Sequence, residues 1–165
     1  MAGFWWVLAL APAAFGALVL LSRPALRRSR SGRLARARRD FHLQRERLEI
    51  RFLQLAAARQ QPDAAELFDW DRCEFDDDVA YVRSRTTGEL AALVGMTVAR
   101  RDPDSPVADI ADLLGAMSTG TAIFRFDGKH WCTDGKALLN LNPAEAIRRL
   151  ASDMELLDRE MATRG

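Results

Sequence analysis

The sequence predicts an α+β protein in which a transmembrane helix precedes a small antiparallel sheet packed against helices. Three observations lead to this fold class. Residues 4–21 carry no charged side chain, residues 23–39 carry eight arginines and no acid, and the remainder alternates helical and strand patterns between turn signals. The chain therefore divides into a transmembrane helix (4–21), an Arg-rich juxtamembrane segment (22–39) and a cytoplasmic α+β domain (40–165).

The apolar run is long enough to cross a bilayer. At about 1.5 Å rise per residue, its 18 residues span about 27 Å, close to the ~30 Å hydrocarbon core. Short flanks rich in Lys and Arg stay in the cytoplasm, so we expect a single-pass protein of the cell inner membrane with its N-terminus outside. A cleaved signal peptide fits less well, because no positive side chain precedes the run. A buried core helix fits less well because the run has no polar face.

The net charge of +1 hides a strong polarity along the chain. All 23 Asp and Glu residues, but only sixteen of the 24 Lys and Arg residues, lie from Asp40 onward, which gives that part a net charge of −7. Arginines near anionic lipid contribute about 1 kcal/mol each to membrane binding, although their role can also be limited to fixing the orientation of the helix. Nucleic acid is not an expected partner, because the domain is acidic. The expected lipid-contacting residues are Arg23, Arg27, Arg28, Arg30, Arg33, Arg36, Arg38 and Arg39.

The domain begins with an expected helix from Asp40 to Arg59, and Pro62 prevents its continuation. Its apolar face is wider than a surface helix needs, which favours packing on the domain's own sheet. The alternative is a parallel dimer seam next to the membrane. The face contains two neighbouring stripes, one formed by Phe41, Leu48, Phe52 and Leu55 and the other by Leu43, Ile50, Leu53 and Ala57.

Two β-hairpins follow. Residues 79–85 and 90–99 flank a turn in which Gly88 supplies the positive φ. In the second hairpin, residues 122–126 lead through Asp127 and Gly128 into residues 130–133, and residues 137–141 are a further short strand. Together they predict an antiparallel sheet.

Two more helices complete the prediction. Ser105 and Pro106 open a short amphipathic helix that closes near Gly120. The last helix has Asn142 as N-cap, Pro143 at N1 and Glu145 at N3, a variant of the capping box. Its apolar stripe, which favours core packing over a coiled coil, consists of Ile147, Leu150, Met154, Leu157 and Met161. One antiparallel sheet with helices on one face fits this element order, as in cystatin-like, NTF2-like and roadblock- or longin-like folds.

Few residues indicate chemistry. The acids between Asp69 and Asp78 are ligands that Ca²⁺ or Mg²⁺ accept, but they lack EF-hand spacing and are better explained as a solvated loop. His130, Cys132 and Asp134 lack a C-x-x-C or H-x-x-x-H pair that would anchor a metal. No base is placed to activate Cys73 or Cys132, which a cytoplasmic domain keeps reduced. We expect no catalytic residue, no metal and no cofactor.

Three functions fit these patterns. The favoured one is a membrane-tethered interaction or scaffold domain, with the lipid bilayer and a protein partner or a homodimer as its contacts. The alternative is a small-ligand-binding domain of NTF2-like or cystatin-like form, with a pocket floored by Phe124, Phe126 and Trp131. A metal-dependent enzyme that uses the acids of residues 69–78 is a weaker third.

Three segments also resemble a known family. Residues 41–60 are the expected helix, residues 73–98 contain TGEL-x-ALV, and residues 121–147 contain FRFDG-x-x-W-x-TDG and NLNP. They are similar to an uncharacterised bacterial family, typical of planctomycete genomes, of small membrane-anchored proteins with no known activity. Residues 102–118 depart from its pattern. The resemblance implies one coherent domain over residues 41–150 and assigns no catalytic residue.

Overall fold

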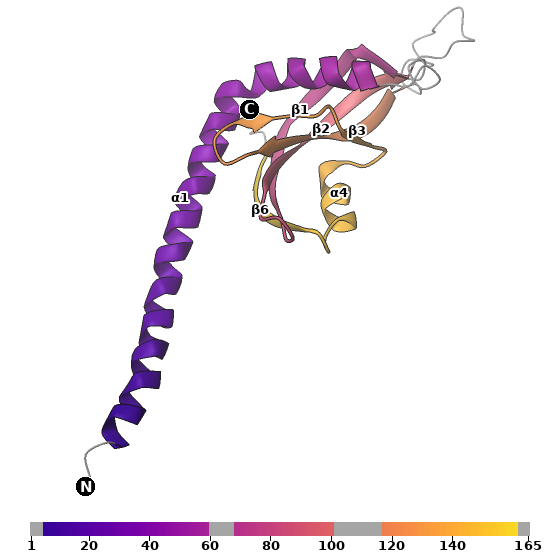
Figure 1. The fold of residues 1–165 in the computed structure, drawn as a ribbon. Coiled ribbons are helices and arrows are strands. Elements are labelled where there is room, and N and C mark those ends of the chain that lie inside the picture. The colour runs from indigo at the N-terminus through magenta and orange to yellow at the C-terminus, as the bar shows by residue number, and fades with distance from the viewer. Residues whose placement is uncertain (1–4, 60–67, 101–116, 162–165) are drawn as a thin grey trace, which may run out of the picture. The chain divides into compact units, whose positions relative to one another are not determined.

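The computed structural model describes the backbone of residues 5–59, 68–100 and 117–161, and the side chains of residues 32–59, 68–99 and 117–161. The chain divides into two compact units, Met1–Leu43 and Gln44–Gly165. The second unit holds all the described strands and the short helix α4 (Pro143–Arg149) (Figure 1).

Helix α1 (Trp5–Arg59) ends at the predicted residue but begins far before the predicted start at Asp40. Residues 33–39 are Arg, Leu and Ala, which are strong helix formers, so nothing there begins a new helix. Among the described side chains, no helical stretch has the length and apolarity that crossing a membrane requires. The apolar run of residues 4–21 lies outside those side chains, and the transmembrane helix stays a prediction.

One antiparallel sheet forms the framework of the second unit, as predicted. Its strands follow the order β4-β3-β2-β1-β6, and β5 pairs with the other half of the β3 edge that β4 occupies. Short turns connect β1 to β2 and β3 to β4, which are neighbours in the sheet. The bounds are β1 (Phe68–Ser84), β2 (Leu90–Arg100), β3 (Met117–Phe126), β4 (Trp131–Cys132), β5 (Ala137–Leu139) and β6 (Met154–Glu160).

Both predicted hairpins are confirmed. In the turn between β1 and β2, Gly88 has a φ of +73°, a backbone angle that residues other than glycine rarely adopt. In the turn between β3 and β4, the Asp127 carboxylate accepts the backbone N–H groups of Lys129 and His130, both at 2.7 Å. Gly128 has a φ of +99° there. The predicted short strand is β5.

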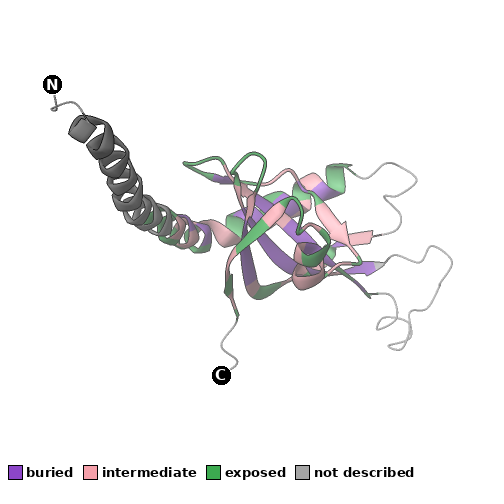
Figure 2. Cartoon of the chain, turned by 90° about the horizontal axis from the view of Figure 1, so that it is seen from below, coloured by how far each residue is buried: buried purple, intermediate pink, exposed green. Residues whose placement is uncertain are grey.

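Helices cover both faces of the sheet, not one face as predicted. Leu93 pairs directly with Ile123, and Ile147 of α4 packs against the buried cluster to which Leu93 belongs. The next residue, Phe124, lies on the opposite face, where its ring centroid is 5.8 Å from that of Phe52 in α1. Strand β2 is buried on both faces from residue 91 to residue 96, and such a strand needs a packed layer on each side (Figure 2).

A glycine allows α1 to lie close to the loop after β4. Gly135 has a φ of +71°, and a Cβ added there would lie 2.7 Å from the backbone nitrogen of Ala56 and 2.7 Å from the Cβ of Leu55. Neither the backbone nor a Cβ can move aside as a flexible side-chain end would. Only glycine can adopt this positive φ without strain and also leave room for α1.

The last predicted helix is correct at its start and wrong at its end. Asn142 accepts the N–H of Glu145 at 2.9 Å, and the Glu145 carboxylate accepts the N–H of Asn142 at 3.1 Å, which completes the capping box. The helix stops at Arg149, and the following apolar residues form β6, which pairs antiparallel with β1. Without β6, β1 would expose an unpaired backbone edge, and satisfying that edge outweighs the helical spacing of the side chains.

The described end of the predicted middle helix is a strand. Most of it falls on residues 101–116, which lie outside the described residues. Its last part, from Met117 to Gly120, belongs to β3 and pairs with residues 96–99 of β2. This pairing extends the antiparallel contact between β2 and β3.

We predict that Phe52→Ala lowers the free energy of unfolding by about 3–5 kcal/mol, because it removes a fully buried ring and leaves a cavity. Ile50→Ala, two residues away but 59% exposed, should change it by less than about 1 kcal/mol. Urea unfolding of the full chain in mild detergent, followed by near-UV circular dichroism, measures both. Equal losses for the two variants would contradict the packing described above.

Candidate interaction surface

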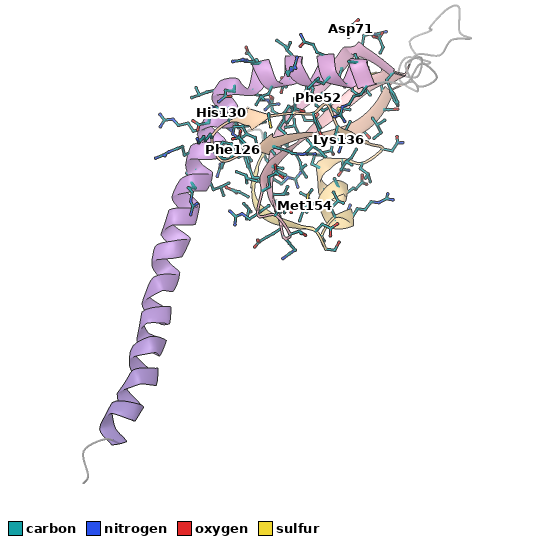
Figure 3. All side chains as sticks on the ribbon, in the orientation of Figure 1. Phe52, Asp71, Phe126, His130, Lys136 and Met154 are labelled. Atoms are coloured by element: carbon teal, nitrogen blue, oxygen red, sulfur yellow. The ribbon has the colours of Figure 1, made fainter. Side chains whose placement is uncertain are left out.

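The outward side of α1 is the most apolar exposed surface that the second unit presents on a helix. Phe52 points from α1 toward the sheet (Figure 3), and Leu48 and Ala56 are buried on the same side. Ile50 lies on the opposite side and is 59% exposed, and Ala57, seven residues later, is also exposed. The first predicted stripe is therefore the buried one.

Charged side chains surround Ile50 on this outward side. Glu46, Arg47 and Arg51 are all exposed. An apolar side chain within a rim of mixed charge is typical of a contact surface, whose centre excludes water and whose rim stays hydrated. Sequence reasoning placed Ile50 in the second stripe but could not tell which of the two stripes the sheet would cover.

The acidic segment is a strand, not the solvated loop that was predicted. Residues 69–78 belong to β1, which pairs with β2 but leaves residues 70–72 and 76–78 as bulges. The second bulge lies opposite Gly95, and a Cβ at that glycine would clash with the Asp76 carboxylate. The absence of a side chain at Gly95 thus makes room for the bulge.

An arginine of α1 holds this second bulge in place. The Arg45 guanidinium donates hydrogen bonds to the backbone carbonyls of Asp76 and Asp77, and it pairs with Glu49 at 2.7 Å. Farther along β1, Asp78 lies 3.9 Å from the guanidinium of Arg159 in β6. The segment therefore contributes backbone acceptors and ion pairs to the fold, a use that the sequence did not reveal.

Neither thiol is activated as a nucleophile. Burial, together with the nearby carboxylates of Glu49 and Glu74, raises the pKa of the Cys73 thiol to about 12. Burial also raises the pKa of Cys132, to which the charge of Asp127 adds. Thiol nucleophiles require the opposite shift, toward the thiolate at neutral pH.

Two residues of the second hairpin that resembled metal ligands, Asp134 and His130, have different ion-pair partners. Asp134 pairs with Arg125 at 3.0 Å and with Lys136 at 3.7 Å. His130 is exposed at the turn, where it lies 3.9 Å from Asp127. Among the described residues, no three His, Cys, Asp or Glu side chains converge on a position that a metal ion could take.

The three expected ligand-binding aromatics belong to two ring clusters. Phe124 is fully buried and packs with Phe52. Trp131 packs with Phe126 at 5.1 Å and with Tyr81 at 6.3 Å between ring centroids. In both clusters the rings meet one another, as aromatic side chains in a core do. Ligand binding by these residues stays a prediction.

The eight arginines expected to contact lipid all lie on α1. Arg33, Arg36 and Arg39 are exposed, and Arg38 is half-buried. The other four lie outside the described side chains: Arg23, Arg27, Arg28 and Arg30. Exposed arginines on a helix can reach a lipid surface, but their contact with lipid stays a prediction.

Comparisons of the chain with protein-family models, with curated proteins and with solved structures find no match.

We predict that Cys73 reacts slowly with iodoacetamide and Cys132 quickly. At a pKa of about 12, roughly one Cys73 thiol in ten thousand is ionised at pH 8, and only the thiolate reacts. The rate at Cys73 should rise about tenfold per pH unit from pH 8 to pH 10 without levelling off. Mass spectrometry of a Cys132→Ser chain and a Cys73→Ala chain measures each thiol alone, and equal rates at pH 8 would contradict the raised pKa.

Proposed function

We propose that the chain is a single-pass protein of a bacterial inner membrane, with its N-terminus outside and residues 40–165 in the cytoplasm. The observation that carries this proposal is the charge pattern: 18 uncharged residues, then eight arginines, then a domain of net charge −7. A helix of that length matches the hydrocarbon core, and arginines on one flank fix its direction.

The sheet domain serves as an interaction module in this proposal. Two of its reactive side chains have roles in the fold: Arg45 donates to the backbone carbonyl of Asp76 in the β1 bulge, and the buried Cys73 thiol keeps its proton. What the domain offers a partner is surface, with Ile50 exposed on α1 and Leu156 exposed at 47% on the outer strand β6. A scaffold or accessory subunit of a membrane complex uses such surfaces.

Membrane retention tests the anchor. We predict that the full chain stays in the membrane pellet after an alkaline carbonate wash, whereas Leu10→Asp with Ala14→Asp releases it. A charge at the centre of a membrane helix costs about 2.5–3.5 kcal/mol, and this variant adds two. Thr87→Asp with Lys129→Asp is the matched control, because both residues lie at exposed turns of the domain, and it should stay in the pellet.

Extraction of the wild-type chain by carbonate would contradict the anchor. The interaction role has its own readout on the same membranes. The chain solubilised in mild detergent should bring with it another protein in a fixed ratio, and residues 40–165 alone should retain that protein. If neither the full chain nor residues 40–165 retain a partner protein, the result would count against the interaction role and favour the small-ligand alternative.

A further inference from the structure

Strand β6 is the outer strand at one end of the sheet. It pairs antiparallel with β1 from Met154 to Glu160, and no described strand pairs with its other edge. Alternate residues of an outer strand direct their backbone N–H and C=O groups away from the neighbouring strand, so such an edge is a template on which a further strand can form. Proteins close such edges with bulges and with charged side chains.

Two backbone N–H groups of β6 have acceptors close by in the chain. The N–H of Met154 donates to the carbonyl of Leu150 at 2.8 Å, and the N–H of Arg159 donates to the Asp158 carboxylate at 2.8 Å. Neither acceptor belongs to β1, so both N–H groups point to the outer side of the ladder. A strand that added to this edge would have to displace these acceptors before it gained the same two hydrogen bonds.

A bulge interrupts the regular spacing on the outer side. Between Leu156 and Asp158, β6 contains one residue more than the stretch of β1 that faces it, and Leu157 is this extra residue. Before the bulge, the outward residues Met154 and Leu156 are two positions apart, as in any regular ladder. The next outward residue, Arg159, is three positions farther along. A regular strand therefore cannot match both halves of β6 at once.

The side chains along this edge add charge. Glu155 and Arg159 are exposed, and the Arg159 guanidinium lies 3.9 Å from the carboxylate of Asp78 in β1. An added strand would remove water from these charged groups, and for this reason charged side chains on an outer strand oppose pairing. The apolar side chain of Leu156 is 47% exposed on the same strand, so it stays available to a partner that packs on side chains.

We propose that β6 is a closed edge: it completes the sheet beside β1 and prevents a second copy of the chain from extending that sheet with a strand of its own. The inference concerns the sheet domain alone and holds with or without the proposed anchor. In an anchored chain the closed edge has a clear use, because copies confined to one bilayer meet at a high effective concentration, where an open edge leads to aggregation.

Opening the edge tests this proposal. In the full chain in mild detergent, deletion of Leu157 together with Asp158→Ala removes both the extra residue and the carboxylate acceptor, and Asp158→Ala alone removes only the acceptor. Asp127→Ala is the matched control, because the Asp127 carboxylate also accepts neighbouring backbone N–H groups but lies in the turn between β3 and β4.

We expect the doubly changed chain to form at least about fivefold more dimer than the wild-type chain at equal concentration, with Asp158→Ala between the two and Asp127→Ala at the wild-type level. Light scattering after size exclusion measures the dimer. Amide hydrogen exchange identifies the contact: exchange at Leu156 should slow in the dimer, because a paired strand accepts its N–H, whereas unfolding would speed exchange throughout β6.

Wild-type levels of dimer in the doubly changed chain, with native near-UV circular dichroism, would overturn the proposal. Equal dimer from Asp158→Ala and Asp127→Ala would overturn it as well, and this comparison carries the test if the deletion unfolds the chain. The wild-type chain supplies a third readout that needs no variant. Exchange at Leu156 that slows as the wild-type chain is concentrated would show that its edge is open.

Discussion

The contact between Phe52 and the sheet is the interaction on which the rest of the domain depends. Its ring centroid lies 6.1 Å from that of Trp70, 5.7 Å from that of Phe75 and 5.8 Å from that of Phe124. These rings come from the bulged start of β1 and from β3, so one side chain joins α1 to two strands. Because Phe52 fixes which side of α1 faces the sheet, it also fixes which side faces away. The exposure of Ile50 is thus a consequence of the same packing.

Several polar groups near this packing have structural roles. Arg45 reaches from α1 to the backbone of the β1 bulge, and Gly95 leaves the space that the Asp76 carboxylate fills. The burial that stabilises this region also keeps the Cys73 thiol protonated. Of the acids that suggested metal binding in the sequence, Asp78 pairs with Arg159, and Asp134 pairs with Arg125 and Lys136.

How far the sequence predicted the fold depends on the range of the forces involved. The hairpins at Gly88 and Gly128 and the capping box at Asn142 are decided within a few residues, and all were predictable. Strand β6 was not, because only the open edge of β1 makes Met154–Glu160 extended. The candidate surface was half predictable: the spacing showed two apolar stripes on α1, but only the sheet decides which one is buried.

The most direct test of the membrane account is the side of the membrane on which Cys132 lies. This native thiol is exposed in the domain, so a Cys73→Ala chain carries a single reporter. The measurement is labelling by a membrane-impermeant maleimide in spheroplasts, before and after the membrane is opened. The account predicts no labelling while the membrane is intact and full labelling once it is opened. Labelling of Cys132 in intact spheroplasts would contradict it, since the domain would then lie outside.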